Sequence, residues 1–543
     1  MSLLWIHEIL LATILGILSH LLFFIKDELD QYAATIVAVF CVLCSILSAL
    51  ILLQELNLVR ASALTNLLTA TYLSSLGGSI TLYRLAFHRT RAFPGRRLNA
   101  ISKLFAAYKS IQAYQYHHVL ANLHQKHGDI VRIRPNELSI NSAEAHSILY
   151  GSNSECTKGP WYSLGGVGLN LHRTRDVYLH SKQRPFWEEA FSVEALDRWM
   201  VNLNCQVDRL IENISALDTF DMSSVLSSHG FDMMSAFTFS KGIEIPPPPD
   251  TAQALRLLSQ SQQLLGSIGH VPWMYGIAKY LPLLLQSSTE FTKLADQKVN
   301  SRRARGEPTI PDLFSFLLET ESNPLSAGFP LSWEARLAIV VGSKILSIIV
   351  TAASFYLAIN PTLLASLRDD LDPLFHEGNF DPRKQHSGLD SILNESMRLQ
   401  PPKPSGLQRV SPSEGLSIGN VFIPGNTICR MPHFVAWRDD RNLVEPDLFI
   451  PERWTTKKEM LIHPEVFKPL GSGDYDCVGR RLAWVQLRLT LALLVVNFDW
   501  ELQAGVDATT WEIAGRIISR WSLTLCHSQF SVDRKGKKSF ECL

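Results

Sequence analysis

The chain has 543 residues, of which 46% are hydrophobic, and its 51 Lys and Arg side chains are balanced by 51 Asp and Glu side chains. A chain of this length can bury a large core, and the lack of a basic excess argues against a nucleic-acid partner. The eight cysteines are sparse and irregularly spaced, which is not typical of a disulfide framework, so we expect the soluble part to lie in a reducing compartment.

Three apolar stretches open the chain, at residues 9–25, 32–54 and 61–83. A bilayer core requires about 20 apolar residues per helix, so residues 1–92 are predicted to be a membrane anchor with two or three transmembrane helices. The number stays open because the third stretch is diluted by polar residues and glycines. Basic residues cluster between Arg84 and Arg97, which predicts that everything after the anchor lies in the cytosol.

The chain from residue 93 to 543 contains no linker, repeat or low-complexity tract, which predicts one large domain. Residues 130–140 and 416–428 alternate apolar and polar side chains around turn residues, which predicts two β-hairpins. The proline run 246–249 predicts a surface loop. Most other segments have helical periodicity, so the predicted fold class is mainly α with small β-sheets, preceded by N-terminal transmembrane helices.

The longest apolar segment of this domain, Trp333–Ile359, predicts a helix with Ser332 as its N-cap and a stop at Asn360–Pro361. A further membrane span is the competing interpretation. Lys344 in the middle of the segment and the lack of interfacial anchors argue against it.

A glycine-rich loop, Leu470–Gly479, presents Cys477 directly before an apolar helix. Backbone N–H groups at a helix N-terminus favour negative charge on sulfur, and glycines allow the chain to approach a flat cofactor closely. Thiolate ligation pushes electron density onto haem iron and favours O–O cleavage. On this loop alone, a buried structural cysteine is the competing interpretation.

Two further motifs precede the loop. Glu395 and Arg398 lie at i and i+3 of one predicted helix, where they can pair, and Arg453 in the segment F-I-P-E-R-W supplies a second guanidinium for the same carboxylate. In this order, the three motifs resemble the cytochrome P450 family, over essentially the whole chain from Phe93 onward. The resemblance is closest to fungal microsomal members of specialised metabolism.

The resemblance implies a haem-thiolate catalytic domain with haem b as cofactor and Cys477 as the axial ligand of the iron. It also implies that Glu395, Arg398 and Arg453 form a structural triad without a catalytic role. Further haem contacts are implied for His180, Arg184, Arg409, Tyr475 and Gly479.

The expected distal helix departs from the family pattern A-G-x-D/E-T, whose acid and alcohol relay protons to bound dioxygen. The matching residues are Val341–Ile345, with Lys344 in place of the acid and Ile345 in place of the alcohol. General acid catalysis typically supplies about 10²- to 10⁴-fold, so this loss requires an explanation. We expect Gly342, Ser343 and Ile345 to line the oxygen side of the haem.

Three explanations stay open. The substrate or a water chain through Ser343 or Ser347 delivers the protons, the chemistry does not need protonation of the O–O bond, or the protein is inactive.

The function implied is that of a monooxygenase that inserts one oxygen atom of O₂ into an apolar small molecule of fungal secondary metabolism. The sequence has no flavin or nicotinamide fingerprint, so the resemblance implies NADPH-cytochrome P450 reductase as electron donor, with the enzyme in the endoplasmic reticulum membrane. Two alternatives remain: a reductase-independent haem-thiolate isomerase or dehydratase, and a non-catalytic P450-like membrane protein.

Overall fold

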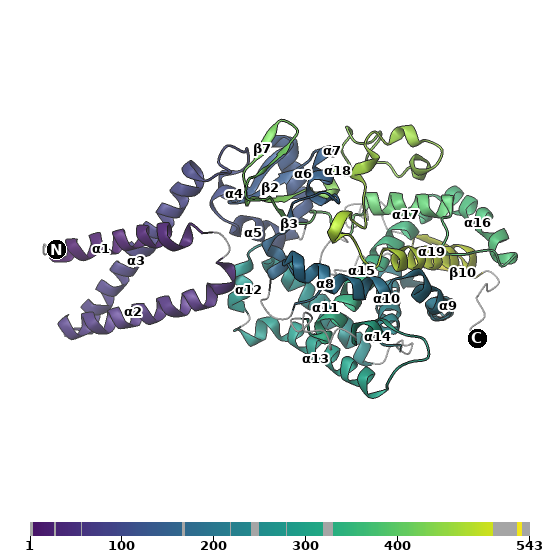
Figure 1. The fold of residues 1–543 in the computed structure, drawn as a ribbon, viewed down its shortest axis with the longest axis horizontal. Coiled ribbons are helices and arrows are strands. Elements are labelled where there is room, and N and C mark those ends of the chain that lie inside the picture. Colours follow the sequence, from purple (N-terminus) through teal and green to yellow (C-terminus); the bar gives the residue numbers. More distant parts are fainter. Residues whose placement is uncertain are drawn as a thin grey trace.

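The computed structural model describes residues 4–26, 29–55, 57–113, 115–164, 169–217, 219–240, 249–278, 280–318, 329–502 and 529–534. Three apolar helices project from one end of a large body (Figure 1). The body is mainly helical with three small sheets, which confirms the predicted fold class. Residues 246–248 of the predicted loop lie outside the described residues. Pro249, the last residue of that prediction, is instead the first residue of α11, because the first turn of a helix tolerates proline.

The projecting helices are α1 (Leu4–Ser19), α2 (Ala33–Glu55) and α3 (Leu58–Leu82). The helices of the body are α4 (Arg97–Ile101), α5 (Leu104–Ala113), α6 (Tyr116–His127), α7 (Ala143–Tyr150), α8 (Val177–Ala190), α9 (Val193–Ser215), α10 (Met222–Phe239), α11 (Pro249–Ile268), α12 (Pro272–Ala278), α13 (Pro282–Ala304), α14 (Leu313–Leu318), α15 (Leu331–Ala358), α16 (Pro361–His376), α17 (Ser387–Leu399), α18 (His433–Ala436) and α19 (Arg480–Asn497). The strands are β1 (Ile130–Arg134), β2 (Glu137–Ile140), β3 (Thr157–Lys158), β4 (Thr219–Asp221), β5 (Arg409–Val410), β6 (Leu416–Ile418), β7 (Val421–Ile423), β8 (Ile428–Arg430), β9 (Phe498–Leu502) and β10 (Gln529–Arg534).

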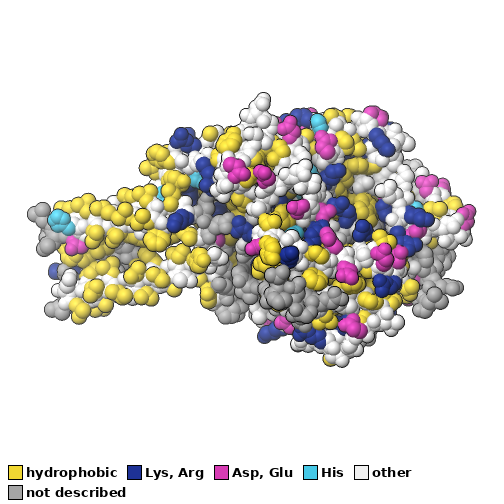
Figure 2. Space-filling model, in the orientation of Figure 1, with side chains coloured by type: hydrophobic (Ala, Val, Ile, Leu, Met, Phe, Trp, Pro, Cys, Tyr) yellow, Lys and Arg dark blue, Asp and Glu magenta, His cyan; other side chains and the backbone are white. Residues whose placement is uncertain are grey.

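The projecting helices pack against one another and leave their outer faces apolar. Both α1 and α2 contact α3, and a Cβ added at Gly16 of α1 would lie 2.6 Å from the carbonyl oxygen of Tyr72 on α3. Hydrophobic side chains cover the visible surface of this projection, while charged side chains gather on the body (Figure 2). Trp5–Phe24 and Asp30–Gln54 are long and apolar enough to cross a membrane, whereas α3 does not reach the same hydropathy.

The long helix α15 runs through the interior of the body and packs against α10, α13, α17 and α19. It has the length and hydropathy of a membrane span, but 61% of its most apolar window is buried inside the protein, so the membrane-span interpretation is wrong. The helix begins at Leu331 with Pro330 in the N-cap position, two residues before the predicted start, so Ser332 is not its cap. The predicted stop is confirmed, because α16 begins at Pro361.

A five-stranded sheet of order β1-β2-β8-β5-β3 brings distant segments of the chain together. Its β1–β2 pair is the predicted hairpin, with Ile130 opposite Ile140. The second predicted hairpin is confirmed for β6 and β7, while β8 leaves that pair and joins the larger sheet. The antiparallel register of β3 and β5 sets Lys158 opposite Arg409. Two cations that are far apart in the sequence therefore become neighbours.

Cys41, Cys44, Cys156, Cys429 and Cys477 are free thiols. Cys205 is disulfide-bonded, which the sparse cysteine spacing did not predict.

A buried ion-pair cluster joins α17 to the chain that leads to Cys477. The carboxylate of Glu395 accepts hydrogen bonds from Arg398 Nε (2.9 Å) and Nη2 (2.8 Å) and from Arg453 Nε (3.0 Å), and all three side chains are 0% exposed. The indole of Trp454 and the backbone N–H of Ile450 donate to the same carboxylate, each at 2.9 Å. Every lone-pair direction of the carboxylate is therefore used.

The guanidinium groups of the cluster then collect backbone carbonyls. Arg398 donates to Trp437 O and Leu448 O, each at 2.9 Å, and Arg453 donates to Val444 O at 2.7 Å and to Glu445 O at 3.0 Å. Residues 437–450, which have little regular structure, are held in place by these bonds.

Replacing Glu395 by Gln should strongly destabilise the protein, because Arg398 and Arg453 would remain buried without a compensating charge. Removing one partner of a buried ion pair costs about 3–5 kcal/mol. Urea unfolding of the detergent-solubilised protein measures this loss. The control is Glu452→Gln, an exposed acid of the same segment, which should change the free energy of unfolding by less than about 0.5 kcal/mol. Equal urea midpoints for both variants would contradict a structural role for Glu395.

Candidate functional site

The cysteine loop is closed by its own backbone before α19 begins. The N–H of Cys477 donates to the carbonyl oxygen of Leu470 at 2.9 Å. Gly471 (φ +76°) and Gly473 (φ +67°) adopt left-handed conformations that favour glycine. A Cβ added at Gly473 would lie 2.5 Å from the carbonyl oxygen of Gly151, so this loop packs directly on the chain that follows α7.

Arg184 of α8 holds the loop from the other side. Its guanidinium donates to the carbonyl oxygens of Asp474 (3.0 Å) and Asp476 (3.2 Å) and forms ion pairs with the carboxylates of Asp476 and Glu188. The charge of Arg184 is thus already shared with the cysteine loop.

Two cavities adjoin each other in the interior. The first, named here the cysteine cavity, has a volume of about 200 Å³ and lies between the cysteine loop and α15. The second cavity has a volume of about 240 Å³ and lies between α15 and the chain around residues 161–173, α11, α12 and α13. Leu337, Val341 and Ile345 of α15 line both cavities, so this part of α15 is the wall that the two cavities share.

Most of the expected site residues meet in the cysteine cavity. Its walls include residues named from the sequence: Gly342, Ile345, His180, Arg184, Arg409, Tyr475, Cys477 and Gly479. Ser343 lines neither cavity and differs from the expectation, because it faces α10, where its carbonyl oxygen would lie 2.5 Å from a Cβ added at Gly230. Gly342 and Ser343 are neighbours on a helix, so the two positions face directions about 100° apart around the helix axis.

Ser347 also belongs to the α10 side. Its hydroxyl lies 2.9 Å from the hydroxyl of Ser227, and it does not line either cavity. Lys344, by contrast, lines the second cavity, where burial lowers the pKa of its ammonium group to about 7. The two serines therefore do not lead into the cavities, and the side chain that carries exchangeable protons at this level of α15 is Lys344.

Positive charge concentrates at one end of the cysteine cavity. Tyr475 lies between two cations, with its ring centroid 4.9 Å from Lys158 Nζ and 5.0 Å from Arg409 Cζ. Burial lowers the pKa of Lys158 to about 7, and repulsion by Arg409 and Arg184 acts in the same direction. Burial also lowers the pKa of His180 to about 3, together with repulsion by Lys158, Arg184 and Arg409. The cationic side chains of this cluster therefore repel one another more than nearby acidic groups compensate.

The residues present fit the haem that the family resemblance implies. The Nε of Arg409 is buried and has no hydrogen-bond partner among the described residues, and an anion beside it would satisfy this donor and relieve the repulsion. The two propionates of haem b are anions of this kind. At the other end, burial raises the pKa of the Cys477 thiol, although Lys403 and the Gly479 N–H oppose the shift. A metal cation at the sulfur would hold it as a thiolate.

Two residues of the site carried no clear signal in the sequence. Lys158 is an isolated lysine, and its place beside Arg409 follows from the pairing of β3 with β5. Glu334, at the start of α15, is 0% exposed and accepts hydrogen bonds from the Leu171 N–H (3.1 Å) and the Gln183 side chain (3.3 Å). It ties the chain around Leu171, which borders both cavities, to α15. Burial raises the pKa of Glu334 to about 8.

Comparison with known proteins agrees with this geometry. A family model described as "Cytochrome P450" matches residues 100–519. Cytochrome P450 monooxygenase FCK2 of Fusarium pseudograminearum is 34% identical, over 92% of this chain and 93% of the relative. Cytochrome P450 monooxygenase orf5 of Eupenicillium brefeldianum is 34% identical, over 81% and 90%. Tryprostatin B 6-hydroxylase of Aspergillus fumigatus is 28% identical, over 92% of each chain.

Replacing Glu334 by Gln should change how stability depends on pH. A carboxyl group whose pKa is raised on folding binds its proton more tightly in the folded state, so its contribution is complete at low pH and is lost as the pH rises toward about 8. Between pH 5 and pH 8.5 the unchanged protein should lose at least about 1.4 kcal/mol more than the variant, the equivalent of one pKa unit. Thermal unfolding at both pH values measures the difference.

The exposed Glu189 of α8 supplies the matched control, and Glu189→Gln should follow the unchanged protein at both pH values. Parallel pH dependence of Glu334→Gln and the unchanged protein would mean that Glu334 is ionised in the folded state.

Proposed function

The chain belongs to the cytochrome P450 family and is an oxygen-incorporating oxidoreductase with a haem-iron cofactor. From this premise we propose that it holds haem b through Cys477 and inserts one oxygen atom of O₂ into an apolar small molecule of fungal secondary metabolism. The observation that carries the proposal is the cysteine cavity, whose walls contain Cys477 together with Gly342 and Ile345 of α15. When bound, the haem would supply the activation of O₂: one oxygen atom would go to a carbon of the substrate, and the other would leave as water with two electrons and two protons.

Each wall of the cavity has its own task in this proposal. Cys477 holds the iron, and the closed loop from Leu470 keeps the sulfur in position. Lys158 and Arg409 bind the propionates, supported by their convergence on Tyr475. Gly342 allows the side chain of Met234 on α10 to pack against α15 at the cavity wall, since a Cβ there would lie 2.6 Å from the Met234 sulfur. Glu395, Arg398 and Arg453 position the loop from a distance and do not touch the cofactor.

Proton supply on the oxygen side rests on Lys344 and the substrate in this proposal. The hydroxyl of Ser347 is engaged with α10, so a water chain through Ser343 or Ser347 has no support from the geometry. Lys344 holds a proton at Nζ in the wall of the second cavity, one residue from Ile345, which lines both cavities. Its lowered pKa allows this proton to be given up and recovered near neutral pH.

The electrons come from NADPH-cytochrome P450 reductase in this proposal, on the cytosolic face of the endoplasmic reticulum. Residues 1–92 act as a multi-pass anchor for the catalytic domain 93–543. The direction of the chain supports three spans, because α1 runs toward the body, α2 runs away from it and α3 returns (Figure 1). α3 is the least apolar of the three, and its 25 residues are about 37 Å long, which is enough to cross a bilayer core.

Reduced membranes treated with carbon monoxide test the proposed ligand. The unchanged protein should give the Soret band of a thiolate-ligated haem, and Cys477→Ala should lose it completely. The control is Cys429→Ala, which removes a free buried thiol in β8 and should retain the band. A thiolate-type band in Cys477→Ala would assign the iron to another residue, and its absence from the unchanged, folded protein would overturn the oxygenase proposal.

Protease protection of sealed microsomes tests the anchor. With three spans, an epitope tag at the N-terminus lies in the lumen and should survive external protease, while a tag at the C-terminus should be digested. Detergent should expose both tags. Digestion of both tags in intact microsomes would mean that α3 does not span the membrane.

A further inference from the structure

The described residues that line the second cavity include basic side chains but no acidic ones. Four basic side chains line it: Arg173, Arg336, Lys344 and Lys403. Neither Asp nor Glu occurs among its lining residues within the described parts of the chain. All four side chains are half-buried, and such an excess of partly desolvated positive charge is costly unless an anion shares the cavity. The cavity is therefore built for more than an apolar molecule.

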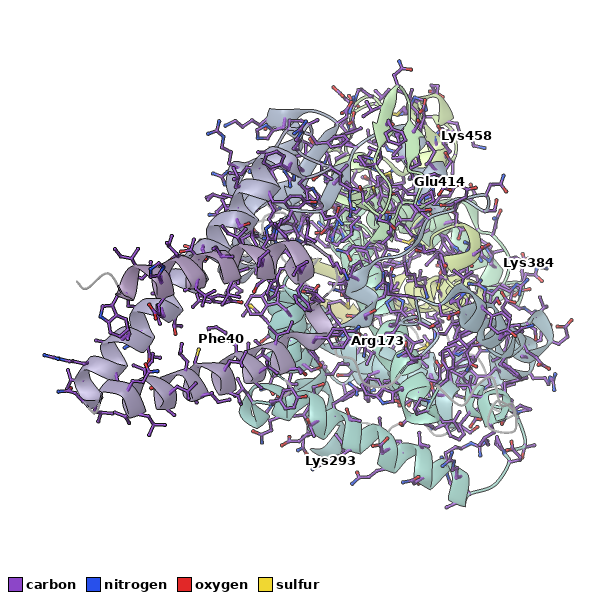
Figure 3. All side chains as sticks on the ribbon, turned by 60° about the vertical axis from the view of Figure 1, so that its left-hand side comes forward. Phe40, Arg173, Lys293, Lys384, Glu414 and Lys458 are labelled. Carbon is purple, nitrogen blue, oxygen red and sulfur yellow. The ribbon has the colours of Figure 1, made fainter. Side chains whose placement is uncertain are left out.

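Two of these cations converge on one indole ring. The guanidinium carbon of Arg336 lies 4.5 Å from the ring centroid of Trp333, and that of Arg173 lies 5.6 Å from the same centroid. A hydrogen bond from Arg336 to the hydroxyl of Thr292 on α13 fixes one of the two groups. Arg173 (labelled in Figure 3) comes from the loop before α8 and Arg336 from α15, so two segments far apart in the chain bring their charges to the same ring.

These two guanidinium groups lack an acid at contact distance. Among the described residues, no carboxylate lies within 4 Å of Arg173, Arg336 or Lys344. Burial lowers the pKa of Arg336 to about 10, with Tyr275 and Asp296 opposing the shift and Arg173 adding to it. A planar carboxylate matches the fork of donors that a guanidinium presents.

An apolar strip along α15 leads from this pair toward the cysteine cavity, while polar side chains of other segments (Asn170, Ser261, Gln262, Tyr275 and Ser288) complete the walls of the second cavity. Arg336, Val340 and Lys344 repeat at intervals of four along α15, and Leu337, Val341 and Ile345 form the adjoining row. From Arg336 to Ile345 the helix rises by about 13 Å. A molecule with one end at the guanidinium pair therefore has an apolar path to the wall shared with the cysteine cavity.

We propose that the substrate is an amphiphilic carboxylic acid, whose carboxylate binds Arg173 and Arg336 beside Trp333 while its apolar body extends along α15 to Ile345. This rests on the proposed function and names the substrate class for the same site. Lys344 lies two turns, about 12 Å, from Arg336 and does not contact the carboxylate.

Matched pairs of ligands separate charge from shape. The probes are ω-phenylalkanoic acids with chains of four to ten carbons, each compared with its primary amide. Displacement of 4-phenylimidazole from the haem, followed in the Soret band, detects a ligand whose apolar end passes Ile345 and reaches the cysteine cavity. At least one acid should bind ten times or more tightly than its amide. The Arg336→Gln variant should bind the acid at least ten times more weakly than the unchanged protein, while its affinity for the amide stays the same. The Arg336→Lys variant should bind the acid more tightly than Arg336→Gln does.

Lys344→Met should change the affinity for the acid by less than threefold. The control is Lys293→Met, at an exposed lysine of α13, which should leave this affinity unchanged (Figure 3). Amides that bind as tightly as their acids, or a panel in which nothing displaces 4-phenylimidazole, would overturn the proposal. A larger loss in Lys344→Met than in Arg336→Gln would overturn the orientation. A protein without the carbon monoxide band, or one that does not bind 4-phenylimidazole, would instead contradict the proposed function.

Discussion

The buried carboxylate of Glu395 is the constraint on which the cysteine side of the molecule depends. It is fully enclosed and satisfied by two guanidinium groups, one indole and one backbone N–H. An ionised group in such a place is tolerated because every partner is present at once, so the cluster forms as a unit or not at all. Through Arg398 it fixes Trp437, whose indole donates to the carbonyl oxygen of Val466 at 3.0 Å, and the chain then enters the loop of Cys477. These contacts fix the position of a segment that has little regular secondary structure of its own.

The cysteine cavity has the opposite character, because its charges are not balanced. Lys158 and Arg409 face each other across two short strands, and Arg184 is drawn to the cysteine loop. Folding brings these cations together although they repel one another, and an anionic cofactor would reduce this repulsion. The protein without cofactor is therefore less stable at this end than with it, and binding of the cofactor and completion of the fold are coupled.

α15 divides its roles by helical face. The face toward α10 is packed tightly, with Gly230 accommodating the backbone of Ser343 and a pair of serines in contact. The face toward the cavities combines a glycine, branched aliphatic side chains and two cations. Lys344 lies where the family pattern has an acid, and Arg336, two turns away on the same face, adds a second positive charge to the walls of the second cavity.

Local pattern was sufficient for part of this description. Apolar length predicted the N-terminal helices and α15, alternation predicted two hairpins, and the order of Glu395, Arg453 and Cys477 indicated the family, because each of these features depends on residues close together in the chain or on their sequence. Pairing across distance was not readable. Lys158 beside Arg409, Arg173 and Arg336 on Trp333, and the turning of Ser343 away from the cavity all depend on strand register and helix rotation. Packing sets both, and a single sequence does not encode them in any short segment.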